Sequence, residues 1–184
     1  MKGVHPLRGR EFRPWKNGGG ETAEILVSPA GAGFDDFDWR ISTAIVASDG
    51  PFSLFPGVDR VLTVIEGGAM ELELDGLRHR LDAAAAPLAF PGDAPVSARL
   101  EGGSLLDLNV MARRPLRITV AREKLDPVVP SSRAALALLM EDHAGLARLD
   151  LIDLHAADPA LLRALAGASA LTIEIRDEAP RSSP

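Results

Sequence analysis

Cysteine and tyrosine are both absent from this chain of 184 residues. Without cysteine, the protein has no disulfide, no thiolate nucleophile and no cysteine zinc site. No hydrophobic run reaches the roughly 20 residues of a membrane span, and residues 1–17 lack the apolar core of a signal peptide. We therefore expect a cytoplasmic protein that does not act at a membrane.

Basic stripes and paired histidines are also missing. The net charge is −6 and the 20 Lys and Arg residues are scattered, which argues against binding of nucleic acid. The four histidines are not spaced as pairs of ligands, and imidazole is the usual ligand of catalytic metals. We predict no bound metal and no cofactor.

Short strands separated by turns dominate the first 120 residues, which is typical of an all-β barrel or sandwich. Met70, Leu72 and Leu74 alternate with acidic residues, as in a half-buried antiparallel strand. The sequence predicts a hairpin through residues 66–68 and another turn at Asp75-Gly76. Further expected strands cover residues 22–29, 39–47, 60–66, 78–81, 96–103, 104–112 and 116–123, and residues 87–95 are expected to form a short strand and a turn.

The last third gives a mixed signal. Residues 131–145 are helical by propensity. They also repeat, weakly, the pattern of residues 60–76, which raises a second reading as a buried strand at Ala134–Met140. Residues 158–167 predict a short helix that ends at Gly167, and the segments 146–156 and 170–176 read as strands.

The segment PWKNGGG at residues 14–20 needs an explanation, because three successive glycines are costly to order. Residues 18–23 fit G-x-G-x-x-A, but no strand precedes them and no helix follows, so we reject a dinucleotide site. Asn17-Gly18 is a good turn dipeptide. Two readings stay open: a tight turn into the next strand, or a ligand contact flanked by Trp15, Lys16 and Asn17.

Polar side chains interrupt several apolar strands, notably Arg40, Arg60, Asp107 and Asn109. Asp107 and Asn109 share one face of their strand. This face is either solvated or lines a barrel, and a buried Asp or Asn needs partners. In a barrel, we expect Arg40 or Arg60 to pair with Asp107 and still to have N–H groups that can bind a ligand carboxylate in a bidentate manner.

Four blocks together resemble the HutD/Ves family: RPWKNGGGETAEI, DWRISTA, DGPFSLFPGVDRVLTVIEGG and DLNVMARR. The resemblance implies an all-β cupin (RmlC-like) β-barrel with two barrel halves in one chain. The first half with its N-terminal motif segment covers residues 1–115, a partial second half covers 116–177, and 178–184 form a disordered tail. It also implies a strand near Ala134 and a link to histidine utilisation.

The cupin comparison bears on the metal as well. Aligned on the metal-binding cupin motif, the glutamate position falls on Arg60, and the histidine positions fall within residues 53–58, which contain no histidine. An arginine in place of a glutamate reverses the local charge, so this pocket is expected to prefer an anion.

We therefore predict a non-metal cupin that binds a small anionic metabolite, urocanate- or formiminoglutamate-like, and has a regulatory or accessory role in histidine utilisation. An isomerase- or lyase-type enzyme that uses Asp59, Asp107 or Lys16 as its base, and a protein-interaction module, are alternatives. No catalytic residue is assigned, and a homodimer is left open. The predicted ligand-binding residues are Trp15, Lys16, Asn17, Arg40, Asp59, Arg60, Asp107 and Asn109.

Overall fold

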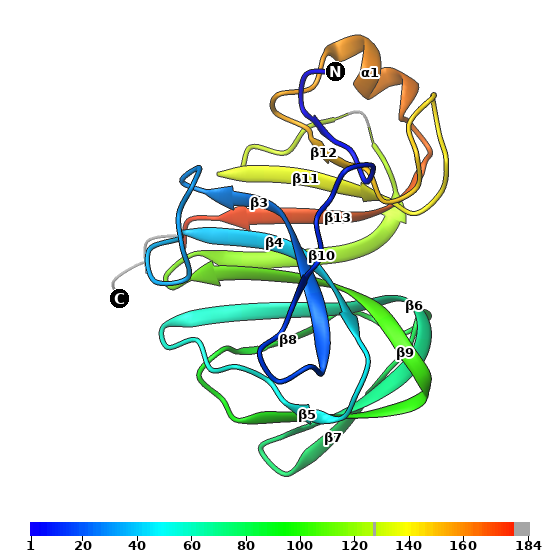
Figure 1. Ribbon diagram of the computed structural model, residues 1–184. Coiled ribbons are helices and arrows are strands. Elements are labelled where there is room, and N and C mark those ends of the chain that lie inside the picture. Colours follow the sequence, from blue (N-terminus) through cyan, green and yellow to red (C-terminus); the bar gives the residue numbers. More distant parts are fainter. Residues whose placement is uncertain (127, 179–184) are drawn as a thin grey trace. The chain divides into compact units, whose positions relative to one another are not determined.

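The computed structural model describes residues 1–126 and 128–178, and nearly all of its regular structure is β-strand (Figure 1). This confirms the predicted all-β, cupin-type fold class. The contacts divide the chain into two compact units. We call Gly9–Arg113 the jelly-roll unit, and Met1–Arg8 with the residues from Arg114 onward the five-stranded unit. Of the expected tail, residues 179–184 lie outside the described part of the chain.

The jelly-roll unit is one antiparallel sheet that curls without closing by hydrogen bonds. The strand order is β2-β3-β4-β9-β6-β7, with β5 beside β9 and β8 beside β6. Its strands are β2 Arg13–Pro14, β3 Gly20–Ser28, β4 Trp39–Val46, β5 Gly50–Pro51, β6 Val58–Leu74, β7 Leu77–Leu81, β8 Leu88–Pro91 and β9 Val96–Arg113.

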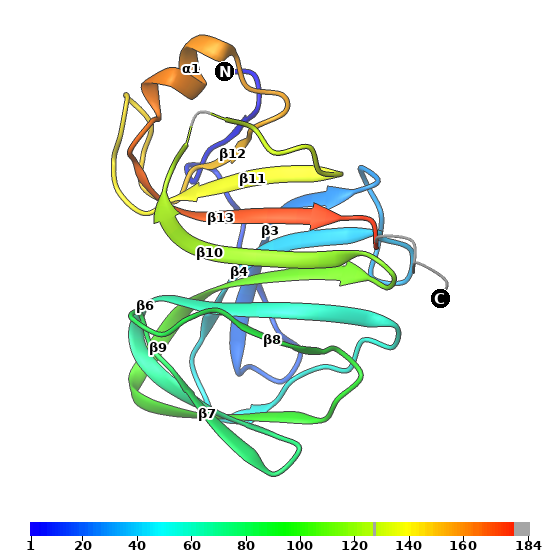
Figure 2. The same cartoon turned by 180° about the vertical axis from the view of Figure 1, so that it is seen from behind.

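Two long strands, β6 and β9, pair along their lengths and produce the curl (Figure 2). The first half of β6 pairs with β8 on its other side, and the second half pairs with β7. In the same way, the two halves of β9 pair with β5 and β4. Each long strand therefore belongs to both layers of the jelly roll and turns the corner between them.

The predicted hairpin through residues 66–68 is wrong, because the chain continues there as one strand with two shifts of register. Gly67 has a φ of +93°, and a Cβ on Gly68 would lie 2.5 Å from the carbonyl oxygen of Glu101. The two glycines thus form a bulge that bends β6 against β9 instead of reversing the chain. The predicted turn at Asp75-Gly76 is confirmed, and both residues have positive φ.

The five-stranded unit is a second antiparallel sheet in the order β1-β12-β11-β13-β10, with one short helix. One face of the sheet packs on a core of Ala137, Leu139, Ile152 and Leu165 with their neighbours. The elements are β1 Val4–His5, β10 Arg117–Lys124, β11 Ala134–Leu139, β12 Leu151–Asp153, α1 Pro159–Ala164 and β13 Ser169–Arg176.

Strand β11 decides between the two readings of the segment at Ala134. Helix propensity is misleading here, and the strand implied by the family resemblance is correct. All six residues of β11 are buried, and the strand lies between β12 and β13. A strand buried on both faces shows no alternation in sequence, so tertiary context overrides the propensity of Ala and Leu.

Candidate functional site

The strand register of the jelly-roll unit brings four of the predicted residues to one face of its sheet. Met111 of β9 pairs with Arg40 of β4 on one side and with Arg60 of β6 on the other. Adjacent strands lie about 4.8 Å apart, so the two arginine backbones are separated by about 10 Å. Asn109 and Asp107 follow two and four residues along the same face of β9. We call Glu24, Arg40, Arg60, Asp107 and Asn109 the polar cluster.

Arg60 is the most unusual member of the polar cluster. Its side chain is buried, with 5% of the residue exposed, and its guanidinium carbon lies 5.2–5.5 Å from the centroids of three phenylalanine rings. These rings belong to Phe52, Phe55 and Phe90, and cation–π attraction at such distances partly replaces lost hydration.

The hydrogen bonds of Arg60 are few for a buried guanidinium. Nη1 donates to the carbonyl oxygen of Ser53 at 3.4 Å, while Nε has no partner among the described residues. Burial, partly opposed by the charge of Asp107, lowers the pKa of Arg60 to about 10, so the side chain is still a cation at neutral pH.

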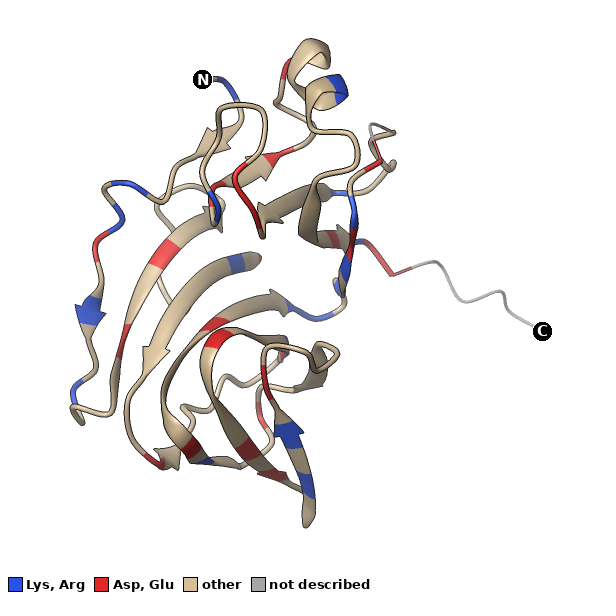
Figure 3. Ribbon diagram, turned by 90° about the vertical axis from the view of Figure 1, so that its right-hand side faces the viewer, with Lys and Arg blue, Asp and Glu red and all other residues tan. Residues whose placement is uncertain are grey.

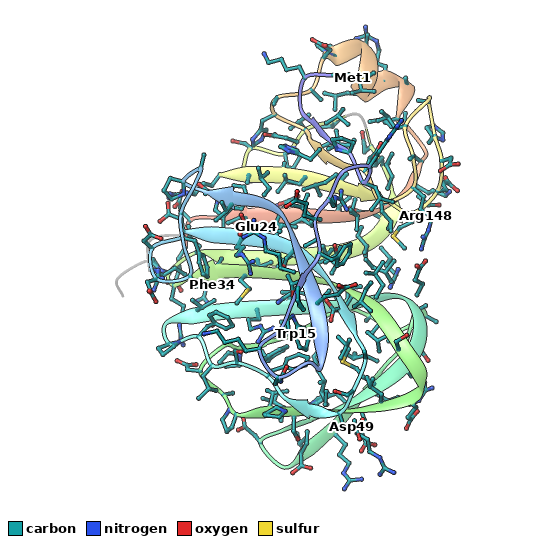
Figure 4. All side chains as sticks on the ribbon, viewed as in Figure 1. Met1, Trp15, Glu24, Phe34, Asp49 and Arg148 are labelled. Carbon is teal, nitrogen blue, oxygen red and sulfur yellow. The ribbon has the colours of Figure 1, made fainter. Side chains whose placement is uncertain are left out.

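Arg40 has a different environment. Its Nε donates to Glu24 Oε2 at 2.7 Å, from the neighbouring strand β3, and its guanidinium lies 4.4 Å from the ring centroid of Phe34. Figure 4 shows Glu24 on β3 and Phe34 in the loop that joins β3 to β4. Phe34 also contacts Phe55, at 5.9 Å between ring centroids, although 58% of Phe34 is exposed. Arg40 is thus paired with a carboxylate, whereas Arg60 bonds to a carbonyl oxygen.

Asp107 is buried on the same face, with 2% of the residue exposed. Its Oδ1 has no hydrogen-bond partner in the described structure, and the same is true of Asn109 Oδ1. Burial raises the pKa of Asp107 to about 7, even though the charge of Arg60 and a hydrogen bond from the Ala44 backbone oppose the shift. A carboxyl group of this kind exchanges its proton near neutral pH.

The other predicted site residues lie elsewhere. Asp59 precedes Arg60 on β6 and therefore faces the opposite side of the sheet. Lys16 and Asn17 are exposed, and the Asn17 side chain accepts a hydrogen bond from the Gly19 backbone at 3.0 Å. Trp15, labelled in Figure 4, donates from its indole nitrogen to Thr22 Oγ1 at 2.7 Å and packs against the apolar core of the jelly roll.

The glycines of PWKNGGG allow a tight turn and close packing of neighbouring groups. Gly18 has a φ of +70° in the turn between β2 and β3, as the Asn-Gly dipeptide predicts. A Cβ on Gly20 would lie 2.3 Å from the carbonyl oxygen of Ile45 and 3.1 Å from the ring of Trp15. Of the two readings, the described contacts favour the entry turn, with Gly20 allowing close approach of β4 and Trp15.

Sequence reasoning did not find Glu24 or the phenylalanine rings of the site. A signal for the rings exists, because seven of the eight aromatic residues fall between Phe12 and Phe55. No comparable signal marks Glu24, since its pairing with Arg40 depends on a register shift in β3 just after that residue.

Charged residues of both signs are interspersed along the described chain (Figure 3). Over residues 1–126 and 128–178, no three His, Cys, Asp or Glu side chains come together as a potential metal site. In that same part of the chain, no helix has the length and apolar character needed to cross a membrane.

The fold and the site define a class of protein: an all-β, cupin-like jelly roll that carries a buried arginine. The sequence model of the HutD family matches residues 10–179. The chain belongs to the HutD family.

Individual relatives agree with this assignment. Protein Ves of Citrobacter koseri is 47% identical over 102 residues, which are 54% of this chain and 52% of the relative. An uncharacterised 21.2 kDa protein from the hutC 3′ region of Pseudomonas putida is 40% identical over 113 residues, or 60% and 59% of the two chains. The chain thus spans between half and three-fifths of the length of these curated relatives, one of which lies beside a histidine-utilisation gene.

Solved structures cover more of the chain. HutD from Pseudomonas fluorescens SBW25 has a TM-score of 0.74 at 30% identity, over 97% of this chain and all of that one. A conserved protein of unknown function from Pseudomonas aeruginosa PAO1 gives the same TM-score at 28% identity, over 96% and 93%. Both structural matches include residues of the jelly-roll unit and of the five-stranded unit.

Proposed function

We propose that the jelly-roll unit binds a small anionic metabolite at Arg60 and Arg40, and that the protein has a regulatory or accessory role in histidine utilisation in the cytoplasm. The observation that carries the proposal is the state of Arg60. It is a buried cation whose Nε has no partner among the described residues and whose Nη1 makes a long contact to a carbonyl oxygen.

The environment of Arg60 is energetically costly for the folded protein. A buried charge without a hydrogen-bonded counter-ion costs several kcal/mol, and an aliphatic side chain of similar volume would fill the space at less cost. The rings of Phe52, Phe55 and Phe90 offset only part of this cost. A bound carboxylate recovers the remainder, because its two oxygens match the geometry of a guanidinium.

The charges of the polar cluster favour the same ligand. Glu24 already neutralises Arg40, and Asp107 is partly protonated near pH 7, since burial raises its pKa to about 7. With Asp107 protonated, the cluster carries one net positive charge, that of Arg60. A ligand with one anionic group therefore balances the charge of the cluster, whereas a dianion would leave one negative charge unbalanced.

Calorimetric titration with three carboxylates tests the proposal: urocanate, formiminoglutamate and formate. Formate is a suitable minimal probe, since the related HutD of P. fluorescens was solved in a formate condition. We expect saturable binding that Arg60→Met removes. Arg78→Met makes the same change of charge on the exposed strand β7 and is the matched control. Absence of binding by the wild-type protein at millimolar concentrations of all three would overturn the proposal.

An enzyme is the second candidate, and Asp107 is the observation that favours it. A buried carboxyl group with a pKa of about 7, and with one oxygen that no described residue bonds, is suited to accept and return a proton. In this reading Asp107 acts as the base of a metal-independent isomerase or lyase, with the anion held at Arg60. Incubation with urocanate or formiminoglutamate in D₂O, followed by NMR, should then show product or exchange of a carbon-bound proton. Spectra unchanged from those of an Asp107→Asn control would exclude this role for both compounds.

A further inference from the structure

Asp107 and Asn109 present hydrogen-bond acceptors that the arginines of the cluster do not use. From the sequence, Arg40 or Arg60 is expected to pair with Asp107. In the described structure, Arg40 bonds to Glu24 and Arg60 bonds to Ser53. Oδ1 of Asp107 and Oδ1 of Asn109 both lack a partner there. The two acceptors therefore need donors from outside the described residues.

A simple carboxylate does not meet this need. A carboxylate has only acceptor oxygens, so it satisfies Arg60 and leaves Asp107 and Asn109 unpaired. An unpaired buried acceptor destabilises the folded protein, and a partner with an N–H group removes that cost. The acceptors lie on β9 beyond Met111, the residue between the two arginines. Asn109 is about 7 Å along the strand from Met111 and Asp107 about 13 Å.

We infer that Asp107 and Asn109 form a donor-binding subsite, and that the ligand is an acid with an N–H group at the end opposite its carboxylate. This inference rests on the proposed function, because it takes the carboxylate to be held at Arg60. The arginine end then supplies affinity for any small acid. The donor subsite selects among acids, since a site built for a donor rejects ligands that lack one.

Protonation of Asp107 links this selection to pH. The charged groups on its face of the sheet are Arg60 from β6, Arg40 from β4 and Glu24 from β3, while its direct neighbours Ala44 and Val64 are apolar. An ionised Asp107 accepts a hydrogen bond more strongly than a protonated one. The preference for a ligand with an N–H group should therefore increase as the pH rises through about 7, the pKa of Asp107.

Two acids of similar shape test the inference. Urocanate and 3-(2-furyl)acrylate both carry a propenoate on a five-membered ring, but only urocanate has a ring N–H. Calorimetry at pH 8 should show the wild-type protein binding urocanate at least tenfold more tightly. Asp107→Leu and Asn109→Leu each remove one acceptor and should each bring this ratio close to one without loss of furylacrylate binding. Asp59→Asn, on the opposite face of the sheet, should leave the ratio unchanged.

The outcomes separate the two proposals. If the wild-type protein binds both acids with affinities within twofold, the donor subsite is wrong and anion binding at Arg60 stands. If the ratio is large but neither variant at Asp107 or Asn109 reduces it, the subsite lies elsewhere and the inference is also wrong. If neither acid binds and formate and formiminoglutamate fail as well, the proposed function falls and the inference falls with it.

Discussion

Replacement of Asp107 by asparagine should change how the stability of the protein depends on pH. The structure buries this carboxyl group and raises its pKa from 3.8 to about 7. The folded protein therefore keeps a proton on Asp107 at pH values where the unfolded chain has lost it. The contribution of Asp107 to the free energy of unfolding therefore decreases as the pH rises from about 4 to about 7, and it is constant above that range.

The magnitude follows from the same shift. Each unit of pKa difference corresponds to about 1.4 kcal/mol, so the full shift is worth about 4 kcal/mol, of which about 2 kcal/mol lies between pH 5 and pH 7. The carboxamide introduced by Asp107→Asn does not titrate and has nearly the same shape as the native carboxyl group. Relative to the variant, the wild-type protein should therefore lose about 2 kcal/mol over this range.

Urea denaturation of both proteins at pH 5, 6, 7 and 8 measures this difference, because other titrating groups contribute equally to the two proteins and cancel. Removal of the Asp107 charge from the vicinity of Arg60 adds an offset, but Arg60, with a pKa of about 10, stays charged throughout and keeps that offset constant. Parallel stability curves for wild type and variant would refute the burial of an ionisable Asp107.

Three further changes test the packing and charge of the jelly-roll unit. Gly20→Ala places a Cβ 2.3 Å from a carbonyl oxygen on β4 and should cost about 1–3 kcal/mol in denaturation. A Cβ at Gly19 meets side-chain atoms of Ser48 and Asn17 rather than backbone, so Gly19→Ala should cost clearly less. Trp15→Phe loses the indole hydrogen bond to β3 and should lower the unfolding free energy by about 1 kcal/mol in the same assay. Glu24→Gln removes the negative charge beside Arg40 and should tighten carboxylate binding several-fold by calorimetry; unchanged or weaker binding would show that Arg40 takes no part.

The fold class could be predicted because its signals are local. Alternation at Met70, Leu72 and Leu74, and turn dipeptides such as Asp75-Gly76, depend on neighbours in sequence. The sequence predicts a hairpin at Gly67-Gly68, where the structure has a bulge, because glycine is common in both hairpin turns and β-bulges. What distinguishes them is the pairing of β6 with β9, a strand that is distant along the chain.

The candidate site was predictable only in part. Arg40, Arg60, Asp107 and Asn109 were singled out as polar residues in apolar strands, and the strand register does bring them to one face. Their individual partners were not predictable. The neutralisation of Arg40 by Glu24 depends on the exact register of β3 and β4, and the rings around Arg60 come from separate places in the sequence.

If Arg60 is a buried cation that binds an anionic ligand, the NMR signal of its Nε–H group reports the binding event itself. The signal is assigned by its loss in Arg60→Met. On titration with formate or urocanate we predict a saturable shift, because the Nε, which has no partner in the described structure, gains a charge-assisted hydrogen bond. A signal that does not move with either acid at millimolar concentration would show that neither anion binds at Arg60.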